Sequence, residues 1–424
     1  MSLFVLSFEN GTRFFYNNIT NELFDENEND VLSQPDKKPT GTKAEVVSPE
    51  TPVRKTRHVE VLKIQLGLKC NYSCSYCNQA IHVNDSSHTD TEDALEFMEK
   101  IKSWVVGHPK RIELWGGEPW LYWKKIKVLM PLLRQRFPYA QFSTVTNGSV
   151  LNDEILKIID DYDFNIAVSH DGPGQFLRGP DPLKDPEKRE YLEKLIANRA
   201  PKGKFSFNSV MCAGNHNPQE IRDFFYREFG PDVHCDFEGV VNDYSDGDIG
   251  LVKEYTVTDY AQLSANVLKG LYDGNLHQTA YFGGRYQNFL QDLQERRQAE
   301  VVGQKCGMDR GTHLSVDLKG NVTTCQNTGS TGNYLLGNIY EEKSPELSYS
   351  WHWSKRRECS NCPVLHLCRG SCMYLEGDNW SRSCNNEYYT AIPIFFAVMS
   401  DIAESRLLTV EGEIIRPEYD IPTA

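Results

Sequence analysis

The chain of 424 residues is long enough to bury a sizeable core and to form roughly two or three domains. Its formal net charge of −14 at pH 7 argues against the capture of nucleic acid or of an anionic membrane surface. No apolar run approaches the roughly 20 residues that span a bilayer, and the opening segment MSLFVLSFENGTRFF has neither the basic region nor the cleavage site of a signal peptide. We therefore expect a cytoplasmic protein without nucleic-acid or membrane partners, in which the 12 cysteines are reduced.

The N-terminal segment is predicted to form a hairpin followed by a linker. Two β-rich runs within residues 4–24 flank Asn10-Gly11, which is the strongest short signal for a hairpin turn. Residues 25–57 are polar, contain prolines and show no hydrophobic period, so we expect a linker there.

From about residue 58 onward, strand and helix patterns alternate. Apolar strands are predicted at residues 59–68, 111–117, 140–148, 164–172, 204–212 and 233–241, and helices at residues 91–106, 119–137, 152–162 and 218–229. Such β/α repeats imply a parallel sheet that curls, so the predicted fold is α/β, a partial (β/α)6 TIM-like barrel. Further helices are predicted at residues 259–274, 286–302 and 387–408, before a loose tail.

The stretch CNYSCSYC places Cys70, Cys74 and Cys77 directly after the first predicted strand, where barrel loops build active sites. Thiolates select zinc or iron–sulfur clusters, but a structural zinc site needs four ligands, and no fourth Cys or His lies nearby at zinc-finger spacing. Three thiolates on a four-iron cluster would leave one iron open to bind a substrate or a cofactor. The spacing therefore favours a cluster with an open iron.

This CX3CX2C arrangement, with the aromatic Tyr76 before its last cysteine, resembles the radical S-adenosylmethionine (SAM) superfamily. The segments GGEP, TNG, SHDGPG and NSV at later strand ends resemble SAM-binding segments of that family, although each alone is also a common turn sequence. The resemblance implies a [4Fe–4S] cluster whose open iron binds SAM, and a 5′-deoxyadenosyl radical that abstracts a hydrogen atom. The SAM contacts that it implies are Tyr76, Gly116, Gly117, Glu118, Thr146, Asn147, Ser169, Asp171, Arg178 and Asn208.

Seven further cysteines lie late in the chain, and their spacing resembles the SPASM extension of radical SAM proteins, a small cysteine-rich C-terminal iron–sulfur domain. The resemblance implies two auxiliary clusters, and so three [4Fe–4S] clusters in all. The nearer set of ligands is Cys306, Cys325 and Cys372, and the farther set is Cys359, Cys362, Cys368 and Cys384. A zinc ribbon would fit the CX2C pieces but not the whole spacing.

The nearer set is short of a fourth cysteine, for which either Cys235 or a substrate atom could stand in. On their own, Cys212 and Cys235 are expected to be buried structural thiols. The predicted domains are residues 1–56 (hairpin and linker), 57–300 (radical SAM partial barrel), 301–390 (SPASM domain) and 391–424 (helix and tail).

Relatives with a SPASM domain mostly modify peptides and proteins, and this resemblance guides the predicted function. Sulfatase maturases carry an aspartate base directly after the cysteine that corresponds to Cys325, whereas Gln326 stands here and cannot accept a proton at neutral pH. We therefore favour a maturase that crosslinks or otherwise oxidises a ribosomally made precursor peptide, with no catalytic residue predicted. The alternative is a protein maturase of the formylglycine-generating (sulfatase-maturating) or quinone-cofactor type. A non-catalytic electron carrier would not need the SAM-binding segments.

Two partners follow from the favoured function. The precursor peptide would carry a leader, and a strand edge of the N-terminal hairpin could receive it by β-augmentation. An external electron donor of the flavodoxin or ferredoxin type would supply the electron that SAM cleavage consumes.

Overall fold

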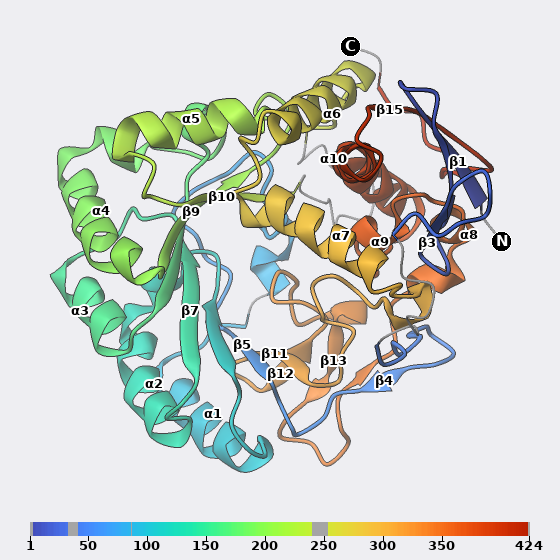
Figure 1. Ribbon diagram of the computed structural model, residues 1–424. Coiled ribbons are helices and arrows are strands. Elements are labelled where there is room, and N and C mark those ends of the chain that lie inside the picture. The colour runs from blue at the N-terminus through green and yellow to red at the C-terminus, as the bar shows by residue number, and fades with distance from the viewer. Residues whose placement is uncertain (1–2, 33–40, 86, 240–252, 423–424) are drawn as a thin grey trace.

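The computed structural model describes residues 3–32, 41–85, 87–239 and 253–422. A nine-stranded open sheet forms its centre, with the strand order β10-β9-β8-β7-β6-β5-β11-β12-β13 (Figure 1). Parallel neighbours in it are β5 (Val61–Gln65), β6 (Arg111–Trp115), β7 (Gln141–Thr146), β8 (Asn165–Ser169), β9 (Phe205–Val210) and β10 (Cys235–Glu238). These strands confirm the predicted α/β fold with a partial barrel. The predicted end of the sixth strand at residues 240–241 lies outside the described residues.

The helices that follow these strands lie on the outer side of the curved sheet in Figure 1. They are α1 (Thr91–Trp104), α2 (Trp123–Arg136), α3 (Asp153–Asp161), α4 (Pro186–Arg199) and α5 (Pro218–Phe229). Helix α1 shows why such segments pack there, because Ala94, Phe97, Met98 and Ile101 recur at helical spacing and are all buried. Helix α4 was not among the predicted helices, since its segment PEKREYLEKLIANR is mostly charged and has a weak apolar period.

The cysteine-rich region continues the central sheet. Strand β11 (His313–Asp317) pairs in parallel with β5, and β12 (Asn321–Thr323) and β13 (Leu335–Asn338) follow in antiparallel order. The segment after β12 folds back over β5, where Gln65 Nε2 donates to the carbonyls of Gln326 at 2.9 Å and Thr328 at 3.0 Å. The first cysteine loop and the late cysteines are thus attached to one sheet.

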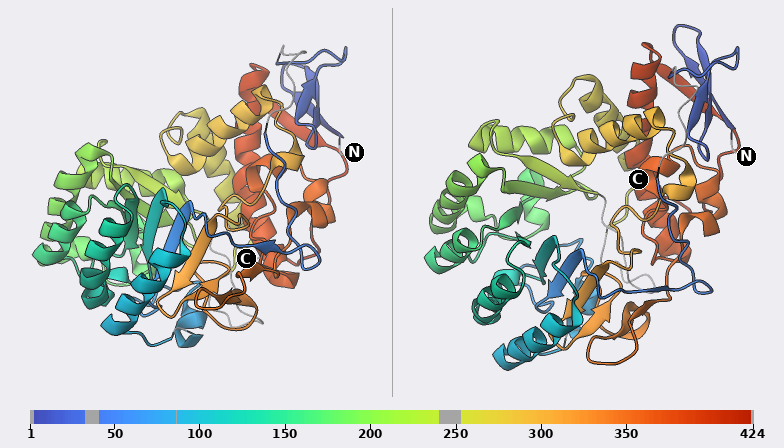
Figure 2. Two further views of the ribbon diagram at one scale, coloured as in Figure 1. Left: turned by 90° about the horizontal axis from the view of Figure 1, so that it is seen from below. Right: turned by 60° about the horizontal axis from the view of Figure 1, so that its bottom comes forward.

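A second sheet has the strand order β15-β1-β2-β3 and lies away from helices α1 to α5 (Figure 2). The predicted hairpin is confirmed in β1 (Leu3–Phe8) and β2 (Arg13–Asn17), which β3 (Glu22–Phe24) extends. The prediction of a loose C-terminal tail is wrong where β15 (Leu407–Glu411) pairs antiparallel with β1. This pairing joins segments from opposite ends of the sequence, and local sequence patterns carry no signal for it.

The helices α6 (Val257–Tyr272), α7 (Arg285–Gln294) and α10 (Gly377–Ile402) pack together beside the small sheet (Figure 2). Helix α10 begins before its predicted start at residue 387. Its first turns, which hold the buried Cys384, are polar and therefore show no apolar period in the sequence. The remaining short elements are β4 (Val53–Arg54), β14 (Glu346–Leu347), α8 (Arg357–Ser360) and α9 (Leu365–Cys368). Strand β4 lies in the predicted linker and pairs with β14, while residues 33–40 of that linker lie outside the described residues.

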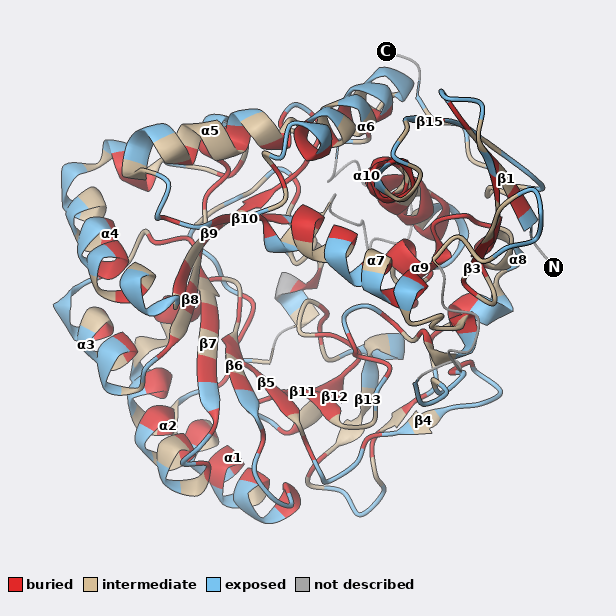
Figure 3. Ribbon diagram, in the orientation of Figure 1, coloured by how far each residue is buried: buried red, intermediate tan, exposed pale blue. Residues whose placement is uncertain are grey.

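Buried residues follow the strands of the central sheet and the inner faces of the helices around it (Figure 3). The predicted domain boundaries at residues 56, 300 and 390 stay predictions, and the last of them falls within α10. Among the described residues, no helix combines the length and the apolar character that crossing a bilayer requires.

Candidate active site

The loop after β5 carries the first three cysteines at the C-terminal edge of the parallel strands. Cys70 is exposed, while Cys74 and Cys77 are half-buried. The amide of Cys77 donates to the carbonyl of Cys74 at 3.1 Å, which folds the loop into a tight turn. Burial raises the pKa of Cys74 to about 11, and the nearby Cys77 and Cys70 thiols act in the same direction. The structure therefore brings the three predicted cluster ligands together at an accessible edge.

The glycine pair of GGEP packs against the chain that leads into this loop. A Cβ atom on Gly117 would lie 2.4 Å from the carbonyl oxygen of Lys69 and 2.5 Å from that of Leu68. A Cβ atom on Gly116 would lie 2.7 Å from the carbonyl oxygen of Gly67. Backbone atoms cannot move aside as a flexible side chain can, so only glycine allows this close approach.

Glu118 joins the loops after β6 and β7, and its side chain is buried. Its carboxylate accepts hydrogen bonds from the Thr146 hydroxyl at 2.8 Å and from the backbone amide of Asn147 at 2.7 Å. Burial raises the pKa of Glu118 to about 7, although these hydrogen bonds lower it. Asn147 in turn donates from Nδ2 to Asn71 Oδ1 at 2.9 Å, inside the cysteine loop. Glu118, Thr146 and Asn147 therefore form one support beneath that loop.

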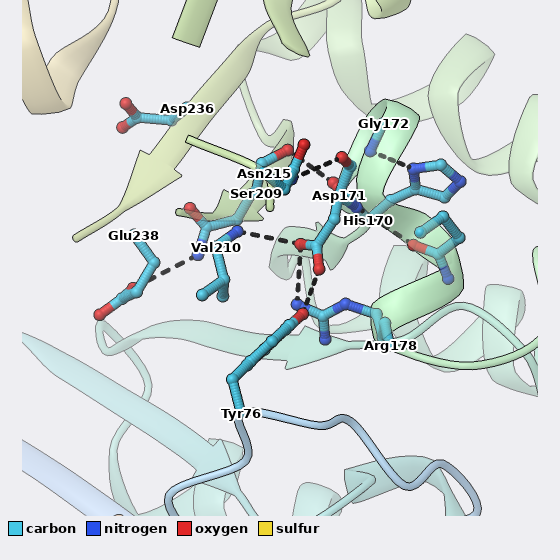
Figure 4. Close-up of polar contacts among 12 residues, drawn as sticks. Tyr76, His170, Asp171, Gly172, Arg178, Ser209, Val210, Asn215, Asp236 and Glu238 are labelled. Atoms are coloured by element: carbon cyan, nitrogen blue, oxygen red, sulfur yellow. Dashed lines mark hydrogen bonds and ion pairs between the residues drawn. The ribbon is translucent and has the colours of Figure 1, made fainter. Parts of the chain in front are cut away.

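Asp171, at the end of β8, is fully buried and holds two other predicted SAM contacts (Figure 4). Its Oδ1 accepts from Arg178 Nη2 at 3.2 Å and from the backbone amide of Val210 at 2.9 Å, and its Oδ2 accepts from the Tyr76 hydroxyl. The Arg178 guanidinium also lies 5.6 Å from the centre of the Tyr76 ring. Both carboxylate oxygens are thus occupied, and the geometry gives Asp171 a positioning role toward Tyr76 and Arg178.

Ser169 and Asn208 lie opposite each other in the register of β8 and β9. The Asn208 amide points toward the last residue of β10, since its Nδ2 donates to Glu238 Oε2 at 3.4 Å. All ten predicted SAM contacts therefore lie within, or shortly after, the neighbouring strands β5 to β9.

The farther set of late cysteines surrounds one cavity, which Tyr388 and Arg416 also line. All four thiols of this set are buried. Arg416 Nη2 donates to the carbonyl of Cys384 at 3.3 Å and to Asn385 Oδ1 at 2.6 Å, and the guanidinium lies 4.0 Å from the centre of the Tyr388 ring. Arg416 could not be singled out from the sequence, because it lies in the segment predicted to be a loose tail.

The nearer set is also brought together. Cys325 and Cys372 pack in one small apolar cluster with Met308 and Tyr374. Burial raises the pKa of Cys325 to about 12, and the thiols of Cys306 and Cys372 add to this because they are close neighbours.

Cys235 does not point toward the nearer set. Its side chain packs in the main hydrophobic core, and the charged groups that act on its thiol are Asp236 and Arg222. The suggestion that Cys235 supplies a fourth ligand is therefore not supported. Cys212 is buried against Tyr76 beside the first cysteine loop, as expected of a structural thiol.

The donor sets fit iron–sulfur clusters in their chemistry, because thiolates select such clusters or zinc. No three His, Cys, Asp or Glu side chains within the described ranges converge as ligands of a single metal ion. The thiols of the farther set instead line a cavity between them. That arrangement leaves room for a cluster, which spreads its thiolates over several irons.

A larger cavity of about 520 Å³ lies where the barrel meets the cysteine-rich region. It is lined by Asn78, which follows the first cysteine loop, and by Cys306 of the nearer set. Its charged and polar lining residues include Asp236, Glu238, Tyr281, Arg285, Lys305 and Glu387. The Glu387 carboxylate accepts from Lys305 Nζ and pairs with Arg285 Nη2 at 3.4 Å. This cavity can hold a polar chain segment between the two groups of cysteines.

None of these charged lining residues was predicted from the sequence. Glu238 had the clearest signal, because it lies near the end of the sixth predicted strand, residues 233–241, whose carboxyl end belongs to the same edge as the other site segments. Arg285, Lys305 and Glu387 come from helices and a loop whose meeting point the sequence does not reveal.

Residues 64–225 match the family model described as the radical SAM superfamily. Radical SAM cyclopropyl synthase TigE of Paramaledivibacter caminithermalis is 24% identical over 346 residues, which cover 74% of this chain and 68% of that protein. The serine-type anaerobic sulfatase-maturating enzyme of Bacteroides thetaiotaomicron is 23% identical over 367 residues, which cover 76% of this chain and 83% of that protein.

Solved structures share the fold. Native anSMEcpe with bound AdoMet has a TM-score of 0.59 at 19% identity, and the match covers 81% of this chain and 98% of that chain. The same protein with bound AdoMet and Cp18Cys peptide has a TM-score of 0.58 at 20% identity, over the same shares of both chains.

Proposed function

We propose that this chain, a radical SAM superfamily enzyme whose radical SAM domain spans residues 64–225, is a maturase of a ribosomally made precursor peptide. It would take a hydrogen atom from the peptide and install a crosslink or a related oxidative modification. One observation carries the proposal: a single cavity of about 520 Å³ reaches from the first cysteine loop to Cys306 of the nearer set. A peptide segment bound there would meet both the hydrogen-abstracting group and an electron acceptor.

We assign three [4Fe–4S] clusters and SAM as the cofactors of this reaction. When bound, they supply a 5′-deoxyadenosyl radical and one-electron acceptors. Cys70, Cys74 and Cys77 would hold the first cluster, and the nearer and farther sets would hold the other two. The chain's own residues prepare the site: the glycine pair lets the cysteine loop sit close to β6, and Asp171 orients Tyr76 and Arg178.

The relatives support a substrate that is a peptide or protein. Two are named as a cyclopropyl synthase and a sulfatase-maturating enzyme, and anSMEcpe was solved with a peptide. An external reductant of the flavodoxin or ferredoxin type would deliver the electron that SAM cleavage consumes. A leader peptide would have to use an outer edge of the small sheet at β15 or β3, because β15 and β2 occupy both edges of β1.

The second candidate is a formylglycine-generating or quinone-cofactor maturase, which the matches to sulfatase-maturating enzymes over 76% of this chain favour. Gln326 argues against formylglycine formation. Its amide oxygen accepts a hydrogen bond from Cys325 Sγ at 3.4 Å, and an amide cannot act as a base at neutral pH.

Incubation of the reconstituted enzyme with two peptides separates the candidates. The precursor peptide encoded beside the gene should lose two hydrogens, about 2 Da, per modification, and a Cys- or Ser-type sulfatase peptide should gain no formylglycine. Mass spectrometry reads both outcomes, with samples lacking SAM as the control. Formylglycine on the sulfatase peptide, with the precursor unchanged, would instead establish the second candidate.

A further inference from the structure

Glu238 is the last described side chain of β10 to face the large cavity. Residues along a strand alternate between its two faces, so Asp236 and Glu238 point one way while Cys235 and Phe237 point the other. Cys235 and Phe237 are buried in the main core, although Phe237 also borders the cavity, and the carboxylates of Asp236 and Glu238 both line it. Figure 4 shows these two carboxylates on β10, beside the strand that carries Val210.

The carboxylates of Asp236 and Glu238 differ in the hydrogen bonds that they accept. Asp236 Oδ1 accepts the backbone amide of Tyr281 at 2.9 Å and is held against that segment. Within the described part of the chain, the Asn208 amide is the one hydrogen-bond donor to Glu238, at 3.4 Å, and it reaches only Oε2. The side chain of Glu238 is exposed to the cavity. Glu238 therefore keeps a carboxylate oxygen available to a bound molecule.

Glu238 touches a predicted SAM contact and shares a cavity with the nearer set of cysteines. It accepts a hydrogen bond from Asn208 of β9, which is among the predicted SAM contacts. Lys305 and Cys306 line the same cavity, and Cys306 belongs to the nearer set. A peptide bound in this cavity would meet the Glu238 carboxylate.

We propose that Glu238 is the general base of the reaction and accepts the proton that the peptide loses when its new bond forms. This inference rests on the proposed function. Atoms and electrons balance in this step. One C–H hydrogen leaves the peptide as an atom and becomes part of 5′-deoxyadenosine. One electron passes to an iron–sulfur acceptor, and one proton passes from the group that forms the new bond to the Glu238 carboxylate. The peptide loses two hydrogens in total, and Gln326 is not needed as a base.

The charges around Glu238 suit this role. Desolvation in the cavity raises the pKa of Glu238 above its usual range, and the charges of Asp236 and Glu387 add to this, while the Asn208 hydrogen bond and Lys305 lower it. Arg285 and Tyr281 face the same cavity. A base must be deprotonated to act, so peptide oxidation should decline as the pH falls through this raised pKa. A base whose pKa is raised toward the working pH is also the stronger proton acceptor.

The test uses Glu238→Gln in the reconstituted enzyme, with a deuterated precursor peptide as the probe. We expect kcat for peptide oxidation to fall by about 100-fold or more, with KM little changed and the acidic limb of the pH profile lost. Deuterium from the peptide should still appear in 5′-deoxyadenosine, because hydrogen abstraction precedes the proton transfer. Glu238→Asp, which keeps a carboxylate, should restore part of the rate and the acidic limb.

Asp161→Asn is the control, because it removes an exposed carboxylate of α3 that pairs with Lys157 and does not line the cavity. It should keep the wild-type pH profile.

Wild-type turnover and pH dependence in Glu238→Gln would overturn the assignment and leave the proposed function intact. A higher KM with unchanged kcat would also overturn it, by showing a binding role. If Glu238→Gln loses iron, Glu238→Asp decides: the full wild-type kcat in that variant would refute the base, because a shorter carboxylate side chain should restore only part of the rate. A wild-type enzyme that oxidises no peptide would refute the proposed function itself, and the base with it.

Discussion

Replacing Cys70, Cys74 and Cys77 together with alanine is expected to abolish the formation of 5′-deoxyadenosine. Reconstituted enzyme should hold about twelve irons per chain, and the triple variant about eight, because only the first cluster loses its ligands. The structure places these cysteines on a loop that is separate from both late sets, so the auxiliary clusters should survive. Iron analysis and chromatography of anaerobic reactions with dithionite measure the two effects.

Cys212→Ser is the matched control for this experiment. Its thiol is buried beside the same loop, against Tyr76, but belongs to no predicted ligand set. It should keep its full iron content and cleave SAM. Stoichiometric zinc in the wild type, or no loss of iron in the triple variant, would contradict the assignment of the first cluster.

Asp171→Ala is expected to destabilise the protein by about 3 to 5 kcal/mol, because it leaves the Arg178 guanidinium buried without its counter-charge. Asp171 is fully buried, and the Arg178 side chain is 9% exposed. The backbone amide of Val210 would lose its acceptor as well. The midpoint of urea unfolding under anaerobic conditions should fall accordingly.

Two further variants test the cause of this loss. Asp171→Ala combined with Arg178→Met should recover much of the stability, since no buried charge is then left alone. Asp161→Ala removes an exposed partner of Lys157, at 2.8 Å, and should change stability by less than about 1 kcal/mol. Equal effects of Asp171→Ala and Asp161→Ala on the free energy of unfolding would show that the buried pair contributes no more to stability than the exposed pair.

The sequence predicted the barrel well because its strands are short apolar runs separated by turn residues, a signal that is local. Helix α4 escaped prediction for the opposite reason, since a mostly charged helix buries only a few side chains and leaves a weak period. The pairings of β11 with β5 and of β15 with β1 escaped prediction because each joins strands that are far apart in the sequence. No local pattern reports such a partner.

The candidate site likewise contains residues that could be predicted from the sequence and residues that could not. Cysteine spacing and short turn motifs could be recognised from the sequence, and the structure brings those residues together. The role of Asp171 as a holder of Tyr76 and Arg178 depends on which side chains meet, and this could not be predicted. Glu238 and Arg416 come from segments that showed no motif, and only the packing of β10 and of the C-terminal segment places them at cavities.

The pairing of β5 with β11 has a consequence for how electrons move. Val61–Gln65 lies in register beside His313–Asp317, so the strand before the first cysteine loop and a strand of the cysteine-rich region are hydrogen-bonded neighbours. Adjacent strands lie only about 5 Å apart and cannot slide without breaking the ladder. A tunnelling path between the first cluster and the nearer auxiliary cluster would then have a fixed length. Its rate should not respond to solvent viscosity, unlike that of enzymes whose redox groups approach one another by hinge motion.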